Sequence, residues 1–499
     1  MKGYGIDFGT TNSVVVACTP TENNPFTILG DQEGRPHPSV VWYKQGSAPV
    51  VGRIAKQQIH IHEVDMGNFF VRSIKRRLGK SERFDVFSEQ KTAWEIASDI
   101  FSYLVRHARS HDEDVQEAVV TIPVRFDGRA RRDLRRAANK AGIHISTFVH
   151  EPFAAVVGHV FRQEGVTGFA RLAGKTILVF DWGGGTLDVT LARVESDGLV
   201  ELASSGLNDR SGDFFDDLIL RWSKQLFETQ EGLTEADVTI PATRMDGYLI
   251  NCENAKLTLS SLQFTQLQAA QVFQTPNGMF NLDTTLNRSQ FEAEIEPTVD
   301  EAVNLVSEVL KTANLMDRQV DEVLLIGGTS RIPFIHEKLH ERFGPRITHV
   351  DDADMIIAEG AAVVASLNMR PFLARTIAIA LADGQYFPVF SAGLPAIPSA
   401  CREKLSMFCT DNRDGWARLI VAEGIHSDEH VQYHTKGNLP IRVSASLAKP
   451  YRPERVDVDF TLNDDLVLEI TGRGATRPEQ EDARTTISDL CFGLSLKVV

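Results

Sequence analysis

Two short stretches of the chain place an aspartate, an aromatic residue and a glycine in a row, with threonine close behind. They are Asp7-Phe8-Gly9 and Asp181-Trp182-Gly183. A glycine-rich turn has no Cβ atoms in the way, so its backbone N–H groups can surround a polyphosphate. A neighbouring carboxylate could hold Mg²⁺, which prefers one or two carboxylates together with phosphate oxygens. The chemistry that these residues could do is therefore the binding of a polyphosphate with its metal.

Each turn taken alone is more typical of a hairpin, where glycine supplies the positive φ and Asp is common. The duplication favours the phosphate hypothesis. Apolar strand residues flank both turns, which indicates two similar lobes that present two loops to one ligand. A P-loop with its Lys-Ser/Thr pair is absent from the sequence, so this would be a different way of binding phosphate.

A third glycine turn follows the buried strand expected at residues 322–326. Gly327 and Gly328 stand at a strand–helix junction, and Pro333 falls in the first turn of the helix, where proline is tolerated. Two glycines here would let the chain pass close to a flat ligand such as a purine ring. A simple packing turn is the alternative interpretation of this stretch.

Six stretches in order resemble the seventy-kilodalton heat-shock chaperones (the DnaK-type family) of the actin, sugar-kinase and heat-shock ATPase superfamily. They are GIDFGTTNS (5–13), FVRSIKRRLG (70–79), HEPFAAVV (150–157), FDWGGGTLDV (180–189), CENAKLTLSS (252–261) and IGGTSRIP (326–333). The resemblance implies an ATPase that hydrolyses ATP to ADP and phosphate. It covers roughly residues 1–370.

The resemblance also implies roles for individual residues. The catalytic residues would be Lys75, Glu151, Asp181 and Thr186. Phosphate contacts would come from Gly9, Thr10, Thr11, Asn12, Gly183, Gly184, Gly185, Thr186 and Gly212. Contacts to the nucleoside would come from Glu253, Lys256, Ser260, Gly327, Gly328, Arg331 and Asp354. Mg²⁺ and a monovalent cation such as K⁺ would lie near Asp7, Asp181 and Asp188.

Several of these residues have a plainer interpretation. Lys75 could be a solvated charge in the run Lys75-Arg76-Arg77, and Glu151 an ordinary carboxylate before proline. Glu253, Lys256 and Ser260 share a helix face at spacing i, i+3, i+7, which could be a surface salt-bridge face. Asp354 could be no more than a helix N-cap.

Composition bounds the class of protein. A chain of 499 residues is too long for one ordinary domain, and a net charge of −15 argues against general nucleic-acid binding. The five cysteines form no CxxC pair, so neither a zinc cluster nor a disulfide framework is indicated. No apolar run approaches a membrane span, and the first loop begins too near Met1 for a signal peptide. We therefore expect a cytoplasmic protein with no membrane or nucleic-acid partner.

The pattern of the chain changes near Pro371. Residues 1–370 alternate strand and helix patterns, and a second lobe begins at about residue 174, so lobe I is about 1–173 and lobe II about 174–370. Residues 371–475 show strict apolar–polar alternation, as in 455–462, which predicts a small antiparallel β-sandwich. In the tail, 476–499, the segment 488–499 alternates again, and we expect it to form an extra strand on the β-sandwich; its alternating apolar residues are Leu490, Phe492, Leu494, Leu496 and Val498.

The sequence also departs from the family. The junction 368–375 is basic rather than acidic and leucine-rich, which leaves interdomain allostery open, and the expected helical lid has no counterpart. We expect an α/β, two-lobed, actin-like ATPase domain with a β-sandwich, and a chaperone-like ATPase that binds unfolded or extended polypeptide. By resemblance, a J-domain co-chaperone and a nucleotide exchange factor are expected partners. A small-molecule kinase and a non-hydrolysing nucleotide-gated scaffold remain the alternatives.

Overall fold

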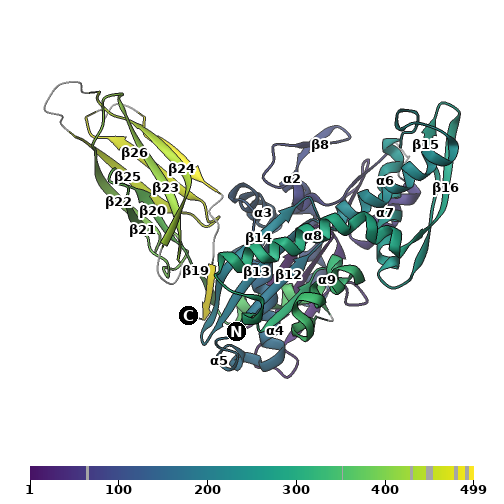
Figure 1. Cartoon of the computed structure of the whole chain (residues 1–499), viewed down its shortest axis with the longest axis horizontal. Helices are drawn as coiled ribbons and strands as arrows, with labels where there is room; N and C mark the ends of the chain where they lie inside the picture. Colours follow the sequence, from purple (N-terminus) through teal and green to yellow (C-terminus); the bar gives the residue numbers. More distant parts are fainter. Residues whose placement is uncertain are drawn as a thin grey trace.

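The computed structural model describes residues 1–62, 67–350, 352–426, 431–445, 453–476, 481–488 and 494–498, and for 60–62, 349, 353–354, 425–426, 494–495 and 498 it describes the backbone alone. Figure 1 shows a mixed α/β body and a β-sandwich that projects from one side of it. This confirms the predicted fold class. The described part of the chain contains no helix that is long and apolar enough to cross a membrane.

Two sheets form the centre of the α/β body. The first has the order β11 (His144–His150), β10 (Glu117–Ile122), β1 (Gly3–Phe8), β2 (Asn12–Cys18) and β3 (Phe26–Leu29), with β4 (His37–Pro38) paired to β2. The second has the order β18 (Ile347–His349), β17 (Glu322–Ile326), β12 (Thr176–Trp182), β13 (Thr186–Glu195), β14 (Gly198–Asn208), β28 (Leu494–Val498) and β19 (Met369–Leu373).

Both sheets repeat one arrangement. In each, an antiparallel hairpin lies beside a parallel strand: β1–β2 with β10, and β12–β13 with β17. Every residue of β12 is buried, as expected for a strand covered on both faces. The shared arrangement confirms the duplication that was predicted from the two Asp-aromatic-Gly turns, and it brings both turns to the same side of the body.

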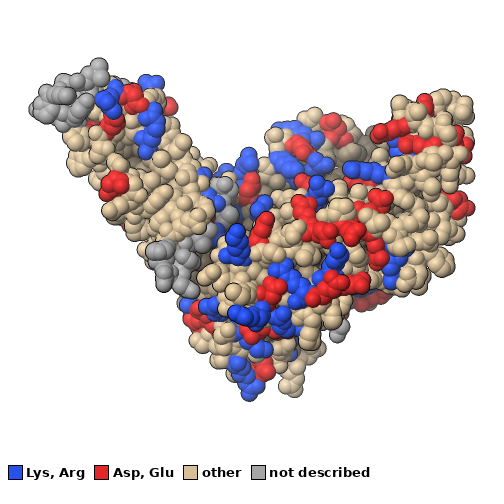
Figure 2. All heavy atoms as spheres, in the orientation of Figure 1, with Lys and Arg blue, Asp and Glu red and all other residues tan. Residues whose placement is uncertain are grey.

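Helices cover the sheets. They are α1 (Arg53–His62), α2 (Ala93–Arg109), α3 (Gly128–Lys140), α4 (Glu151–Glu164), α5 (Gly168–Arg171), α6 (Gly212–Glu231), α7 (Ala242–Leu259), α8 (Arg288–Thr312), α9 (Pro333–Phe343) and α10 (Ala353–Ser366). Thr92 and Glu95 form a capping box that fixes the start of α2. The exposed face of α8 carries Glu294, Glu296, Asp300 and Glu301. Figure 2 shows acidic side chains over the part of the body where Figure 1 draws α8.

Smaller elements complete the body. They are the sheets β6 (Val50–Val51)–β5 (Val41–Lys44)–β7 (Asn68–Val71), β8 (Arg83–Val86)–β9 (Glu89–Thr92) and β15 (Phe264–Thr275)–β16 (Gly278–Asn287), and the short 3₁₀ helices η1 (Ile74–Arg77), η2 (Gly165–Thr167), η3 (Glu235–Asp237), η4 (Asp317–Gln319), η5 (Gly328–Arg331) and η6 (Gly344–Arg346).

The β-sandwich packs two four-stranded sheets. One has the order β21 (Tyr386–Phe390), β20 (Thr376–Ala380), β23 (Trp416–His426) and β24 (Val431–Arg442); the other has β22 (Arg402–Cys409), β25 (Glu454–Leu462), β26 (Leu468–Gly474) and β27 (Ala483–Ile487). The alternating side chains Val456, Val458, Phe460 and Leu462 are buried as predicted. The alternation of 441–447 predicts a further strand; of its described residues, Ile441 and Arg442 are in a strand, at the end of β24, and 443–445 are not.

Two expectations are corrected by the structure. The extra strand in the tail exists as β28, but it pairs with β14 and β19 of the α/β body and not with the β-sandwich. Residues 489–493 of that prediction lie outside the described residues. The basic run 125–142, with its stripe of alanines and leucine, predicts a helix whose charges face solvent, yet in α3 Arg131 is buried and donates to backbone carbonyls of Asp465 and Leu466. In both cases the periodicity of the sequence predicts the element, but it does not determine what the element packs against.

Candidate functional site

Two glycine-rich turns contact each other at a cavity of ≈ 390 Å³. The first joins β1 to β2 and the second joins β12 to β13. A Cβ on Gly185 would lie 2.6 Å from the Thr10 hydroxyl oxygen, and one on Gly184 would overlap the Thr11 hydroxyl. Glycine is therefore needed for the two turns to approach this closely, and their threonine hydroxyls converge at one wall of the cavity.

Most residues that the sequence predicts for the site line this cavity. They are Asp7, Gly9, Thr10, Thr11, Asn12, Lys75, Glu151, Asp181, Gly183, Gly184, Gly185, Thr186, Glu253, Lys256, Ser260, Gly327, Gly328 and Arg331. Asp188 and Gly212 lie behind the lining: Asp188 is the cross-strand partner of Asp181, and Gly212 N–H donates to the Gly183 carbonyl at 3.1 Å.

Asp354 does not occupy the N-cap position of α10, one of the two roles that the sequence suggests for it. Its side chain lies outside the described residues, and the cap position of α10 is occupied by Asp352. The interpretation of Asp354 as an N-cap is therefore wrong, because the helix begins one residue before it. Whether Asp354 contacts a nucleoside stays a prediction.

Lys75 and Glu151 form a buried ion pair at the cavity. The Lys75 ammonium lies 2.5 Å from a Glu151 carboxylate oxygen, and the two residues are 5% and 8% exposed. Lys75 is held in the 3₁₀ helix η1, which follows Ser73 in the left-handed conformation (φ 53°), and Glu151 opens α4. The plainer interpretation of Lys75 as a solvated charge is thus excluded.

Carboxylates outnumber cations around Lys75. Among the described residues, Asp7, Glu151, Asp181 and Asp188 lie near its ammonium group. Burial, with the charge of Glu151 added to it, raises the pKa of Asp188 to about 7 and holds the pKa of Asp181 well above its usual range. One buried oxygen of Asp188, Oδ2, has no hydrogen-bond partner. An added cation would relieve this excess of negative charge.

The donor set fits a cation that shares its shell with other ligands. Among the described residues no three His, Cys, Asp or Glu side chains converge closely enough to hold a metal on their own. Mg²⁺ commonly takes one or two carboxylates together with phosphate oxygens and water. The residues present fit that mode and not a closed protein cage.

The other end of the cavity is built by α6 and α7. Lys256 Nζ lies 2.8 Å from Asp216 Oδ1 and donates to the Gly212 carbonyl at 2.8 Å. Burial raises the pKa of Asp216 to about 7, although Lys256 opposes the shift. Glu253 lies on the same side of α7 as Lys256, and Ser260 caps the end of that helix; all three line the cavity, as the i, i+3, i+7 spacing predicts.

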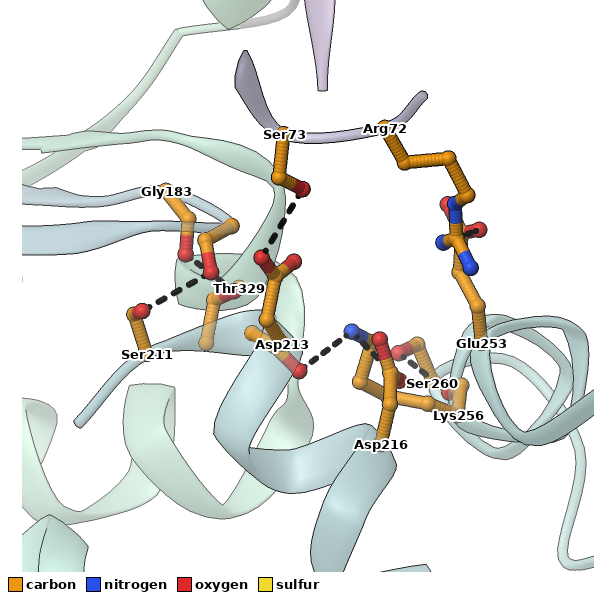
Figure 3. Close-up of polar contacts among 12 residues, drawn as sticks. Arg72, Ser73, Gly183, Ser211, Asp213, Asp216, Glu253, Lys256, Ser260 and Thr329 are labelled. Carbon is orange, nitrogen blue, oxygen red and sulfur yellow. Dashed lines mark hydrogen bonds and ion pairs between the residues drawn. The ribbon is translucent and has the colours of Figure 1, made fainter. Parts of the chain in front are cut away.

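Side chains from the first lobe reach across to this end. Lys56 Nζ lies 3.0 Å from Glu253, and Arg72 approaches the same carboxylate at 3.5 Å. Ser73 Oγ donates to Asp213 at 3.2 Å. Figure 3 shows Arg72 and Ser73 facing Glu253 and Asp213 across the gap between the lobes. The sequence reasoning missed this link. Arg72 and Ser73 lie in the stretch 70–79 that it singled out, but it gave them no role, and no local signal marks Lys56.

The third glycine turn is tied to the second. Gly327 has φ 79°, and the Thr329 hydroxyl donates to the Gly183 carbonyl at 2.8 Å. Ser211 Oγ donates to the Gly184 carbonyl at 2.8 Å. Both hydroxyls appear in Figure 3 beside Gly183. The three segments that the sequence singled out are therefore joined by hydrogen bonds, and the exposed Arg331 lines the same cavity.

Comparison of the sequence with known proteins identifies relatives of this chain. The family model described as "Hsp70 protein" matches residues 4–94 and 82–380. The chain is 33% identical over 393 residues to "Heat shock 70 kDa protein 6, chloroplastic" from Arabidopsis thaliana, covering 73% of this chain and 52% of that protein. It is 30% identical over 366 residues to "Chaperone protein DnaK" from Thermosipho africanus, covering 73% of this chain and 58% of that protein. The chain thus spans about half the length of the curated relatives that it matches.

Proposed function

The chain belongs to the Hsp70 family, and on that premise we propose that it binds ATP with Mg²⁺ in the cavity between the glycine turns and hydrolyses it to ADP and phosphate. One observation carries the proposal. Two turns rich in N–H and hydroxyl donors meet at the same cavity that contains the buried Lys75–Glu151 pair. Donors for phosphate oxygens and a pair suited to phosphoryl chemistry are thus brought together.

Each residue has a defined part in the proposed reaction. The turn N–H groups and the hydroxyls of Thr10, Thr11 and Thr186 hold the phosphate oxygens. The Lys75 ammonium offsets the charge that develops on the transferring phosphoryl group, which is the main requirement of such chemistry. Glu151 orients a water that attacks the γ-phosphorus. The bond between the γ-phosphorus and its bridging oxygen breaks, and ADP leaves.

Cations complete the proposed site. Asp7 and Asp181 would hold Mg²⁺, and Asp188 a monovalent cation such as K⁺. Bound there, Mg²⁺ would neutralise phosphate charge. The support for these assignments is the excess of buried carboxylate over ammonium groups and the unpartnered Oδ2 of Asp188.

The nucleoside is proposed to lie against α7 and η5. Glu253 would accept from the ribose hydroxyls, and the Lys256 stem and the Arg331 guanidinium would enclose the purine, since arginine stacks well on flat rings. The Lys256 ammonium already has Asp216 and the Gly212 carbonyl as partners, so its stem is held in a fixed direction. The α7 side of the proposed purine site is therefore fixed in position before the nucleotide binds.

The β-sandwich is proposed to bind an extended or unfolded polypeptide. A J-domain co-chaperone and a nucleotide exchange factor are proposed partners. Support comes from family membership and from the "Chaperone protein DnaK" relative. The sandwich also offers edge strands, and pairing of an extended segment with a strand edge is a common mode of peptide recognition.

Phosphate release tests the proposal against its alternatives. Purified full chain with ATP and Mg²⁺ is expected to release phosphate with no added acceptor, and adding candidate sugars should leave the rate unchanged. Transfer of the phosphoryl group to a sugar would identify a kinase. Tight ATP binding with no turnover in either case would identify a non-hydrolysing scaffold.

A further inference from the structure

Strand β28 lies between β14, in the sheet of the second lobe, and β19. Strand β19 joins the α/β body to the β-sandwich and is called the linker strand here. On one edge β28 pairs with β14, with Gly198 opposite Lys497 and Leu199 opposite Leu496. On its other edge it pairs with the whole of β19, from Met369 opposite Val498 to Leu373 opposite Leu494. Figure 1 shows this yellow strand at the junction of the two parts. The linker strand therefore reaches the second-lobe sheet through the C-terminus and not by pairing with β14.

The row of pairings continues into the β-sandwich domain. The far edge of β19 exchanges hydrogen bonds with the segment after β21: Leu373 N–H donates to the Leu394 carbonyl at 2.8 Å, and Ala396 N–H donates to the Pro371 carbonyl at 2.9 Å. Strand β28 is thus one link in a continuous hydrogen-bonded row from β14 to the sandwich. Removing that link would leave β14 and β19 with unpaired edges.

The edge of β14 that pairs with β28 matches that strand in shape, burial and charge. A Cβ on Gly198 would overlap the Leu496 carbonyl oxygen, so this edge of β14 fits the strand only because it carries no side chain there. Leu496 is 1% exposed. The next side chain, Lys497, stands between two carboxylates of the β13–β14 turn, 3.5 Å from Glu195 and 3.6 Å from Asp197. Shape, burial and charge together select an extended segment in which leucine precedes lysine.

We propose that the slot between β14 and β19 is a strand-binding site for an extended leucine–lysine segment, that its resident ligand is the chain's own C-terminal strand, and that occupancy of this slot holds the linker on the second lobe. Backbone pairing supplies the affinity, and the glycine edge with its acidic turn supplies the selectivity. Attachment to the same chain raises the local concentration of the strand, so a short segment can fill the slot and still be displaced. The proposal rests on strand pairing and is independent of ATP hydrolysis.

The first test blocks the slot in the full chain. Gly198→Ala is expected to expel β28 and release β19, so that trypsin cleaves after Arg375 about tenfold faster and the amides of Arg370 and Phe372, which lie opposite β28, lose protection from hydrogen exchange. Gly67→Ala is the matched control, because a Cβ there meets nothing within 4 Å. Equal cleavage and exchange in the wild type and Gly198→Ala would overturn the proposal.

The second test supplies the strand in trans. Leu496→Glu is expected to empty the slot, and this chain should then bind a labelled peptide of residues 492–499, followed by fluorescence anisotropy. Adding Gly198→Ala should abolish binding, and a peptide carrying Lys497→Glu should bind several-fold more weakly. Failure of the cooperatively folded Leu496→Glu chain to bind, or binding that Gly198→Ala leaves unchanged, would overturn the proposal. If Leu496→Glu does not fold, the trypsin and exchange results on Gly198→Ala decide.

Discussion

Lys75 is the residue on which the proposed chemistry depends most. It is the ammonium group at the centre of four carboxylates, and it contacts Glu151 directly. We predict that Lys75→Ala still binds ATP, because the turns and α7 remain, but hydrolyses bound ATP roughly 10²–10³-fold more slowly, as is typical when one stabilising group at the reacting centre is lost.

The measurement is single-turnover hydrolysis together with ATP binding and thermal unfolding. Arg77→Ala is the matched control, since Arg77 lies in the same 3₁₀ helix but is exposed and pairs with Glu82. Hydrolysis by Lys75→Ala within a few-fold of wild type would remove Lys75 from the mechanism.

Asp188 should make the stability of the nucleotide-free protein depend on pH. Its pKa is about 7 in the fold, against 3.8 for an ordinary aspartate, and burial is the main cause. Between those pH values the unfolded chain has lost a proton that the folded chain retains, so raising the pH favours unfolding. We predict that the free energy of unfolding falls from pH 5 to pH 7.5, and that Asp188→Asn flattens this slope.

Denaturant unfolding at several pH values, without nucleotide, checks this expectation. Added Mg²⁺ and ADP should reduce the slope in the wild type, because a bound cation favours the charged carboxylate. An identical slope in wild type and Asp188→Asn would show that another group governs the pH dependence.

Helix α3 is the element that connects the first lobe to the β-sandwich domain. Arg131 donates to the carbonyls of Asp465, Leu466 and Ser488, and Arg135 pairs with the Asp465 carboxylate at 2.8 Å. Burial lowers the pKa of Arg131 to about 10, so it stays charged at neutral pH. We predict that Arg131→Met destabilises the protein by about 1–3 kcal/mol, because buried carbonyls lose their donor.

Hydrogen exchange gives the specific readout for that variant. The amides of 464–467 should lose protection in Arg131→Met and keep it in Arg129→Ala, whose side chain is 73% exposed on the same helix. Unchanged protection in Arg131→Met would mean that packing, and not these hydrogen bonds, holds the two elements together.

At the scale of helices and strands, the sequence predicts where an element forms better than it predicts which other element it packs against. The two Asp-aromatic-Gly turns were predictable because strand alternation resumes on both sides of each. The same alternation in Leu494, Leu496 and Val498 predicts a strand, but it cannot say which sheet receives it. Likewise, Asp213 and Asp216 begin an ordinary amphipathic helix, and only the fold brings them to the cavity. The proposed domain boundaries stay predictions.

For the whole molecule, Arg375 stands between the two parts of the chain. It lies 3.9 Å from Glu201 of β14 and 3.9 Å from Glu423 of β23, and both carboxylates are buried. We predict that Arg375→Ala lowers the free energy of unfolding by about 1–3 kcal/mol, since both charges lose a partner. It should also split one unfolding transition into two as the parts uncouple.

Scanning calorimetry of the full chain, with the exposed Arg370→Ala as control, distinguishes these outcomes. A single transition of unchanged midpoint in Arg375→Ala would mean that this residue does not couple the two parts. The basic linker would then be a simple tether.

The central claim is that this molecule converts bound ATP to ADP and phosphate without an acceptor. The most direct measurement mixes an excess of full chain and Mg²⁺ with labelled ATP, stops the reaction at intervals, and follows ADP and phosphate together. We predict that ADP and free phosphate rise in equal amounts with a single rate. Bound ATP that stays intact over many hours, while the protein remains folded, would contradict the claim.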